Sequence, residues 1–292
     1  MRRIERTGSR TAEWTCLSRA FSTLETDCHY HSNDHIAPLL LPWFVKPMLR
    51  IPLVRTIYKR MAPKGVYNYV VARTRYVDDV FRQALADDFR QILIFGAGFD
   101  TRALRFQQES HNLRILELDV LSTQSAKISQ YRKRNLTVPM NLTFVPIDFD
   151  KESVPVKLNQ AGFQKGQRSL FVLEGLLMYL EPASVDATFR TIQEYGGEGS
   201  WVVFDYVYAS VLRKEKLYHG ESEIMASVTK AGEAWHFGIE RGNVGKFLAA
   251  YGLKPIDEKD AQALEKMYFT DAAGRIVARV NGVHCLVTAE KR

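Results

Sequence analysis

The feature of the sequence that most constrains the fold is the stretch QILIFGAGFDTRALRF, residues 91–106. Its apolar run at 92–95 predicts a strand that is buried on both faces, as the central strands of parallel sheets are. The run stops at Gly96-Ala97-Gly98, and the apolar positions that follow fit one face of a helix over 99–108. A glycine turn lets bare backbone approach a ligand, and the start of a helix offers unpaired N–H groups. The stretch therefore predicts a ligand cradle.

The rest of the chain alternates between strand and helix patterns. Four further strands are expected at residues 113–119, 142–148, 169–175 and 200–206, and helices at 182–195 and 242–251. One or two closing strands are expected within 275–289. Alternation of this kind predicts βαβ units, so we expect an α/β fold with a mostly parallel sheet.

Helical patterns also flank the expected sheet. We predict an N-terminal helical cap over residues 1–80 and a core over 81–292. A mostly polar and helical insertion at about 207–241 is expected to form a lid over the core.

Composition excludes several classes of protein. The net charge of +7 is spread along the chain, and we find no zinc-finger spacing and no aromatic-basic RNA motif, so we expect no nucleic-acid partner. Prolines and basic residues interrupt the apolar run at 36–54, which excludes a stable membrane insertion; shallow membrane contact stays a minor alternative. Five arginines near the N-terminus indicate a solvated helical face rather than a transit peptide.

The cysteines point to a reducing compartment. Three of them, an odd number, do not make a disulfide framework, so we expect a cytoplasmic protein. The segment Cys28-His29-Tyr30-His31, with His35 nearby, matches no zinc spacing, and a surface or capping role is favoured over a metal site.

Acidic residues follow every expected strand of the parallel series. They are Asp100, Asp119 (close to Glu117), Asp148, Glu174 and Asp205. Ligands of open parallel sheets bind at the carboxyl ends of the strands, although acids at such positions also cap helices. Five in succession favour a ligand that has a ribose, an amino purine and a cationic centre.

Two cofactor classes compete for this site. A nicotinamide dinucleotide favours the pattern G-x-G-x-x-G, but the third glycine position is Thr101, although Arg102 could still neutralise a phosphate. S-adenosylmethionine has no phosphate and needs only one close backbone approach, and its sulfonium tolerates nearby negative charge. The glycines alone do not decide between the two.

Four segments resemble one family when they are taken in order. They are VVARTRYVDD, ILIFGAGFDTRALRF, LELDVLSTQSAKISQ and FVLEGLLMYLEPASV. They are similar to the S-adenosylmethionine-dependent methyltransferases of the leucine carboxyl methyltransferase family, including bacterial relatives that methylate carboxylates in polyketide pathways. The resemblance is clearest over residues 66–206 and implies a class I methyltransferase fold, which is Rossmann-like, with one late antiparallel strand.

The resemblance also implies roles toward S-adenosylmethionine for residues at matching positions. Arg73 would bind the carboxylate of the cofactor, while Gly96 and Gly98 would lie against its methionine part. Asp119 would accept hydrogen bonds from the ribose hydroxyls. Phe95 stands where many methyltransferases have an acid, so one usual signal is missing.

The resemblance also implies roles for residues that follow the third and fourth expected strands. Asp148 and Phe149 would flank the adenine, and Glu174 would sit near the amino group of the cofactor and the methyl centre. Tyr179 is a candidate for orienting the acceptor, and His236 is the first candidate for a base if the acceptor is a hydroxyl.

The expected reaction is O-methylation by in-line displacement, on a carboxylate of a small molecule. Such an acceptor is already ionised at pH 7 and needs no strong base, and an arginine would suit it. The alternatives are a protein C-terminal carboxyl methyltransferase, an NAD-linked oxidoreductase, or a cofactor-binding protein without activity. The sequence leaves the acceptor and the oligomeric state open.

Overall fold

The computed structural model describes residues 10–292. Seven strands form one sheet in the order β3-β2-β1-β4-β5-β7-β6. Their bounds are β1 (Gln91–Phe95), β2 (Arg114–Asp119), β3 (Leu142–Pro146), β4 (Ser169–Leu173), β5 (Trp201–Val207), β6 (Leu253–Lys259) and β7 (His284–Lys291). The strands β1 to β5 pair in parallel, whereas β7 is antiparallel to both β5 and β6. The prediction of an α/β fold with a mostly parallel sheet and a late antiparallel strand is confirmed.

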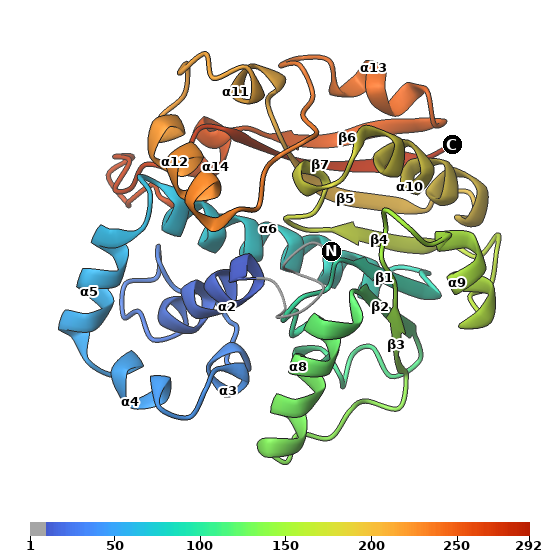
Figure 1. The fold of residues 1–292 in the computed structure, drawn as a ribbon, viewed down its shortest axis with the longest axis horizontal. Coiled ribbons are helices and arrows are strands. Elements are labelled where there is room, and N and C mark those ends of the chain that lie inside the picture. The colour runs from blue at the N-terminus through green and yellow to red at the C-terminus, as the bar shows by residue number, and fades with distance from the viewer. Residues whose placement is uncertain (1–9) are drawn as a thin grey trace.

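Helices surround the sheet (Figure 1). They are α2 (Arg10–Ser22), α3 (Ala37–Leu40), α4 (Val45–Leu49), α5 (Pro52–Met61), α6 (Val66–Ala86), α7 (Arg102–Arg105), α8 (Leu121–Lys133), α9 (Val154–Gln160), the 3-10 helix η1 (Leu177–Tyr179), α10 (Pro182–Tyr195), α11 (Ala209–Leu212), α12 (Glu221–Ala231), α13 (Val244–Ala249) and α14 (Ala261–Tyr268).

Strand β1 contributes to a core on each face of the sheet, because successive side chains of a strand point to opposite sides. Ile92 and Ile94 belong to the core cluster that includes residues of α6, α8 and α14. Leu93 and Phe95 belong to the other, which includes residues of α9, α10 and α13. All four side chains are at most 1% exposed, as the apolar run predicted for a doubly covered strand.

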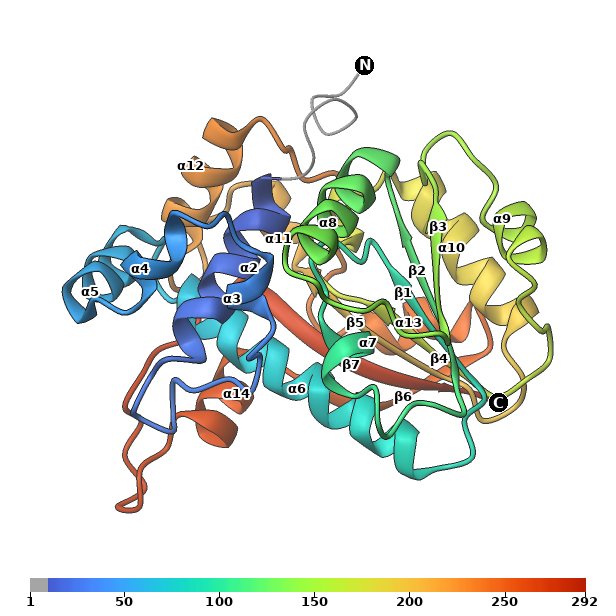
Figure 2. The same cartoon turned by 90° about the horizontal axis from the view of Figure 1, so that it is seen from below.

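The N-terminal helices and α12 gather beside one end of the sheet, as both views show (Figures 1 and 2). The hydroxyl of Ser18 on α2 and that of Tyr58 on α5 lie 2.8 Å apart, which ties these two helices together. Helix α6 runs through residue 80 without a break, so the predicted division between cap and core falls inside a helix. That division stays a prediction.

The closing strands differ from the expectation. Strand β6 comes from 253–259, whereas within 275–289 strand β7 begins only at His284. The segment LKPIDEK was not predicted as a strand because it contains a proline and four charged residues. A proline and charged residues are typical of a strand at the edge of a sheet. The pairing of β6 with β7 is irregular between Pro255 and Asp257, where a bulge accommodates the proline.

Two expected helical regions are shorter than predicted. The helix expected at 99–108 is the four-residue α7, because a turn occupies the residues before it. In the insertion at 207–241, α11 and α12 are helical, but residues 233–238 are not. Ile239 instead forms a parallel bridge with Tyr208, at the end of β5.

Two further findings concern the cysteines and the length of the helices. Cys16, Cys28 and Cys285 are all free thiols in the structure. Within residues 10–292, no helix is long and apolar enough to cross a bilayer. The cytoplasmic location stays a prediction.

Candidate functional site

A cavity of about 590 Å³ lies at the carboxyl ends of the parallel strands. Every residue to which the sequence analysis gave a role toward the cofactor or the acceptor lines it, whereas Asp205 of the five strand-end acids does not. These residues are Arg73, Gly96, Gly98, Asp119, Asp148, Phe149, Glu174, Tyr179 and His236. The structure therefore brings all of them together, although their roles toward a ligand stay predictions.

The glycine turn after β1 forms one wall of the cavity. Gly96 and Gly98 have φ angles of +60° and +52°, which side chains rarely adopt. A Cβ atom at Gly96 would lie 2.8 Å from Leu176 Cδ1, and one at Gly98 would lie 3.2 Å from Ala12 Cβ. Both conformation and space therefore require glycine at these two positions.

At the start of α7, the first helical N–H group, that of Arg102, already has a partner within the protein. The Asp100 carboxylate accepts a hydrogen bond of 2.7 Å from the Arg102 N–H, and its other oxygen contacts the Arg102 guanidinium. Burial by itself would raise the pKa of Asp100, but Arg102, with Lys127 and Arg19 further away, lowers it to about 2. This acid is therefore a structural cap of a short helix.

Asp119 joins the glycine turn to the end of β2. One carboxylate oxygen accepts a 2.6 Å hydrogen bond from the Val120 N–H, and the other accepts one from the Gly98 N–H. Burial raises the pKa of Asp119 to about 6, although these two hydrogen bonds favour the ionised form. Each oxygen keeps lone-pair capacity for a further donor, such as a hydroxyl group.

The loop after β3 supplies a polar and an aromatic side chain to the cavity. The Phe149 and Phe95 rings lie 6.0 Å apart, so Phe149 continues the core toward the cavity. Asp148 forms an ion pair of 2.9 Å with the exposed Lys151 and keeps a partly exposed carboxylate. The pair offers a flat apolar surface beside a hydrogen-bond acceptor.

Glu174 lies between two buried arginines at the end of β4. Its carboxylate is 3.0 Å from Arg73 Nε and 2.8 Å from Arg102 Nη1. Burial opposes the charge of Glu174, yet Arg102 and Arg73 lower the pKa of its carboxyl group below the usual value. Glu174 therefore stays ionised in the cavity wall.

Asp205, the acid at the end of β5, holds Arg73 in place. Its Oδ2 accepts a 2.6 Å hydrogen bond from the Tyr69 hydroxyl and one of 3.1 Å from Arg73 Nη1. Its Oδ1 accepts one from the Gly175 N–H. Arg73 thus reaches the cavity with two acidic partners, rather than as an isolated cation.

Tyr179 and His236 lie on the opposite, lid-facing side. The Tyr179 ring meets the Trp235 ring edge-on at 6.4 Å. The backbone N–H of His236 donates a 2.7 Å hydrogen bond to the Met178 carbonyl, which ties the lid segment to η1. Its imidazole Nδ1 lies 3.5 Å from Glu181 Oε1 at the exposed rim.

Acidic side chains outnumber basic ones in the lining of the cavity. The acids are Asp100, Asp119, Asp148, Asp150, Glu174 and Glu233, and within residues 10–292 the arginines are Arg19 and Arg73. Arg19 is itself bound to Asp34 at 3.1 Å and to the Phe99 carbonyl at 2.7 Å. Both lining arginines of residues 10–292 therefore already have acidic partners, and an arginine for the acceptor stays a prediction; the acidic surplus suits a cationic ligand.

The sequence analysis missed several residues of the lining. The ring of Tyr69 stacks on that of His284 at 4.0 Å, and burial, aided by Arg73, lowers the pKa of His284 well below its ordinary value. Tyr69 is one helical turn before Arg73, a spacing that could have revealed it. His284 carries no local signal, because β7 reaches the cavity only through the fold.

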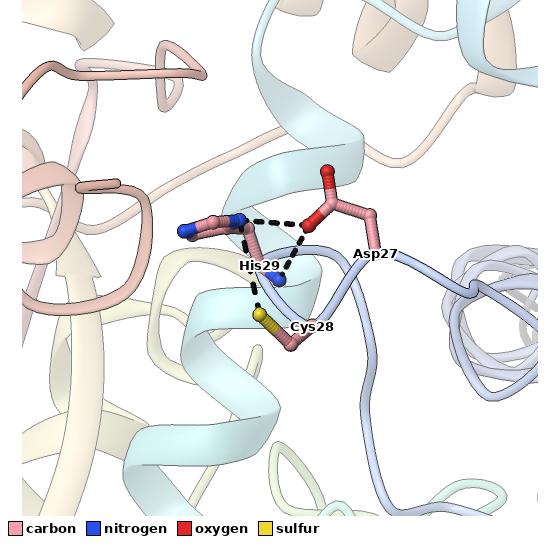
Figure 3. A group of neighbouring side chains, drawn as sticks. All are labelled: Asp27, Cys28 and His29. Carbon is pink, nitrogen blue, oxygen red and sulfur yellow. Dashed lines mark hydrogen bonds and ion pairs between the residues drawn. The ribbon is translucent and has the colours of Figure 1, made fainter. Parts of the chain in front are cut away.

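The cysteine-histidine segment lies outside this cavity. Figure 3 shows Asp27, Cys28 and His29, whose potential ligand atoms lie within 4.8 Å of one another. The His29 Nδ1 is 2.7 Å from Asp27 Oδ1, and its Nε2 is 3.2 Å from the Thr270 carbonyl. Both ring nitrogens therefore have protein partners, and the surface role of this segment stays a prediction.

The nicotinamide alternative loses its main support in the structure. Arg102 is fully buried and bound to Asp78, Asp100 and Glu174, so it does not face a phosphate group. Thr101, at the third glycine position, donates a 2.7 Å hydrogen bond to Asp34. Both positions serve the packing of the turn.

The segment that contains the glycine turn and the acids after β2, β3 and β4 matches a known protein family. A model of the family described as leucine carboxyl methyltransferase matches residues 12–193. The chain belongs to the leucine carboxyl methyltransferase family. The family assignment made from the sequence is therefore confirmed, and with it the enzyme class of a methyltransferase family.

Similar proteins agree with this family. A Mycobacterium marinum protein named "Putative S-adenosyl-L-methionine-dependent methyltransferase" is 34% identical over 67% of this chain and 65% of its own length. The Bacillus subtilis protein YktD, which carries the same description, is 24% identical over 71% of this chain and 68% of its own length. The chain thus spans about two thirds of these relatives.

A solved structure supports the fold. A duf574 family protein from Streptomyces avermitilis superimposes with a TM-score of 0.60 at 12% identity, and the match covers 94% of this chain and 97% of that chain. At this identity the likeness concerns the fold alone.

Proposed function

We propose that this protein is an S-adenosylmethionine-dependent O-methyltransferase that acts on a carboxylate of a small molecule. The proposal rests on the combination of three features in one cavity. The cavity combines Gly98 at a position where a Cβ has little room, Asp119 with remaining acceptor capacity, and an acidic surplus in its lining. These features fit a sulfonium cofactor with a ribose, and the named relatives are described as dependent on the same cofactor.

Each part of that cofactor has a matching group in the cavity. Asp119 would accept hydrogen bonds from the ribose hydroxyls, and Phe149 would pack on the adenine with Asp148 at its amino group. Arg73 and Glu174, which form an ion pair, would bind the carboxylate and the amino group of the methionine part. A zwitterion matches such a pair, since each charged group meets its opposite.

The bound cofactor supplies a methyl group on a positively charged sulfur. The protein would orient the acceptor so that its oxygen could approach the methyl carbon in line with the sulfur, and it would exclude water from the cavity. In such a displacement a methyl carbon–oxygen bond would replace the carbon–sulfur bond, whose electron pair would stay on the sulfur. Positioning of this kind lowers a barrier by several kcal/mol.

An acceptor that is already ionised suits the groups on the lid-facing side. Tyr179 and Trp235 line the cavity there, and His236 is at its rim and partly exposed. A carboxylate needs no base, and the Tyr179 hydroxyl would orient it by donating a hydrogen bond. Ile224 and Val228 of α12 also line the cavity, which favours an acceptor that is apolar apart from its carboxylate.

A second candidate is methylation of a hydroxyl or a phenol. The 3.5 Å approach of His236 Nδ1 to Glu181 Oε1 favours it, because the carboxylate would hold the imidazole in a fixed orientation at the rim of the cavity. The substitution His236→Gln separates the two candidates. Carboxylate methylation would keep at least about half of its rate, whereas phenol methylation would fall roughly 10²-fold or more.

The test of the proposed function is an assay of transfer from methyl-labelled S-adenosylmethionine to a panel of small carboxylic acids, phenols and C-terminal peptides. We expect a labelled product with carboxylic acids that releases methanol in mild base, as methyl esters do. A base-stable product would favour the phenol candidate. Lack of binding of S-adenosylhomocysteine in calorimetry would contradict both.

A further inference from the structure

Helices α4 and α5, with the residues that flank them, carry a large exposed apolar surface away from the cavity. We call it the cap apolar face, and its residues are Trp43, Phe44, Met48, Ile51, Leu53, Ile57 and Met61. Trp43 is 75% exposed, Leu53 67% and Met61 80%. Single exposed apolar residues are common on proteins, but a set of seven within residues 43–61, four of them on α4 and α5 and three beside these helices, marks an interaction surface.

The geometry of α5 shows that this exposure is a consistent face. Leu53, Ile57 and Met61 are four residues apart and form one stripe along the helix, with the exposed Arg60 beside it. The opposite side of α5 packs on the protein, where the Tyr58 ring contacts the Trp14 ring at 5.7 Å. Helix α5 therefore has two apolar sides, and only one of them is covered.

The same segment is basic and contains no acid. Residues 35–77 include no Asp or Glu. Arg55 and Lys59 are held by Glu25, whereas Lys46, Arg50 and Arg60 have no acidic partner among the residues that the structure describes. Burial lowers the pKa of Lys46, and the nearby cations Arg134 and Arg50 lower it further, by a smaller amount. Unneutralised cations thus surround the cap apolar face.

We propose that the cap apolar face docks on the surface of an anionic lipid bilayer. The exposed stripe of α5, together with Trp43 and Phe44 before α4 and with Lys46, Arg50 and Arg60, is the kind of amphipathic surface that lies in the headgroup region of such membranes. Lipid phosphates would neutralise Lys46, Arg50 and Arg60, while the apolar side chains enter the boundary of the acyl chains. The association is peripheral, because α5 has ten residues and is too short to span a bilayer.

A second copy of this chain fits the same face less well. A twofold dimer places identical patches against each other, so the unpaired cations of one copy would oppose those of the next. Acidic residues that could compensate them are missing from this segment of the sequence. The charge therefore selects an anionic partner over a self-contact.

The experiment is sedimentation of the full-length protein with vesicles. One set contains phosphatidylglycerol and phosphatidylcholine in equal amounts, and the other contains phosphatidylcholine alone. We expect at least tenfold stronger binding to the anionic vesicles at low salt, and a loss of most of this binding at 0.5 M salt. Binding that is equally weak to both vesicle types would overturn the proposal.

Three variants locate the surface. Trp43→Ser with Leu53→Ser and Met61→Ser should reduce vesicle binding at least tenfold, and so should Lys46→Glu with Arg50→Glu and Arg60→Glu. The matched control is Met267→Ser with Ile256→Ser, which removes two exposed apolar side chains from α14 and β6 and should bind like the unmodified protein.

Binding of S-adenosylhomocysteine, which uses none of these residues, reports whether each variant is folded. The single variant Met61→Ser serves if the triple variant is unfolded, and a several-fold loss is expected for it. Unchanged vesicle binding of the folded variants would overturn the assignment. A dimer in solution that the apolar variants dissociate would also overturn it, by assigning the face to a second copy.

Discussion

Among the residues of the cavity, Asp119 gives the most specific indication of the ligand. Its carboxylate already accepts hydrogen bonds from Gly98 and Val120, and these bonds hold it at the mouth of the glycine turn. A ligand that donates hydroxyl groups to the same carboxylate would gain charge-assisted hydrogen bonds. Its removal would leave those hydroxyls and two backbone donors without a partner.

The first prediction concerns the affinity of this site. Asp119→Ala should weaken S-adenosylhomocysteine binding by about 1–3 kcal/mol, the usual cost of buried donors that lose their acceptor. Calorimetric titration measures the change. Asp150→Ala is the control, because Asp150 is an exposed acid of the same cavity without a predicted cofactor role. Equal losses in both variants would remove the ribose assignment.

A second prediction at this scale concerns pH. Burial raises the pKa of Asp119 from 3.8 to about 6, so between these values the folded protein holds a proton that the unfolded chain has released. The pH dependence of stability is therefore the reverse of that for most carboxylates. The contribution of Asp119 to the free energy of unfolding is most favourable at low pH and is lost as the pH rises through about 6.

The measurement compares denaturant unfolding of the unmodified protein with that of Asp119→Asn from pH 4 to 8. From pH 8 down to pH 4, the stability of the unmodified protein should improve relative to the variant by at most about 3 kcal/mol, which corresponds to two pKa units. A difference that does not change with pH would show that Asp119 has an ordinary pKa.

At the scale of elements, the glycine turn between β1 and α7 is the part most sensitive to a single methyl group. Gly98→Ala should destabilise the protein by about 1–2 kcal/mol through the left-handed conformation alone. It should also weaken cofactor binding, because the new Cβ would lie on the cavity wall, 3.2 Å from Ala12 Cβ.

The chain contains a matched control for this prediction. Gly166 has a φ of +82°, and a Cβ added there would have no neighbour within 4 Å. Gly166→Ala should therefore show a similar conformational cost in thermal unfolding with no loss of S-adenosylhomocysteine affinity. If both variants bind equally well, the turn does not approach the ligand.

Elements also show where local patterns succeed and fail. Strand β1 and the strands beside it were predictable because a central parallel strand is a short apolar run between turns. Strand β6 was not, since it lies at the edge of the sheet and its pairing with β7 is interrupted next to Pro255. Helix α7 was overestimated because its apolar residues continue past the point at which the backbone turns.

At the scale of the whole molecule, the cavity is shared by parts that are far apart in the sequence. Thr11 of α2, Gly98 of the turn, Trp235 of the lid and His284 of β7 all line it. A ligand that contacts all of these segments stabilises them together. Its binding should therefore raise the stability of the molecule as one unit.

The corresponding prediction is a thermal shift that depends on ligand concentration. S-adenosylhomocysteine at 100 times its Kd should add about 2.7 kcal/mol and raise the melting temperature by about 5 °C, whereas NAD should not change it. Differential scanning calorimetry measures both. A shift with NAD of similar size would revive the oxidoreductase alternative.

The sequence by itself determined the five parallel strands, the glycine turn and the acids that follow these strands, because these depend on local spacing. It also determined the family, since four motifs occur in the right order. All nine predicted site residues line one cavity. For the six at strand ends this follows from the rule that parallel strands end at one edge of a sheet, whereas Arg73, Tyr179 and His236 come from α6, η1 and the insertion.

Only the tertiary structure decided which charges are neutralised. Arg73 is shared between Glu174 and Asp205, Arg102 is buried behind the turn, and the cap apolar face stays uncovered. These facts depend on contacts between residues far apart in the chain, or, among residues 10–292, on the lack of a contact over the exposed side of α5. Local sequence patterns do not predict such contacts, because the contacts depend on how the cap, the sheet and the lid pack around one cavity.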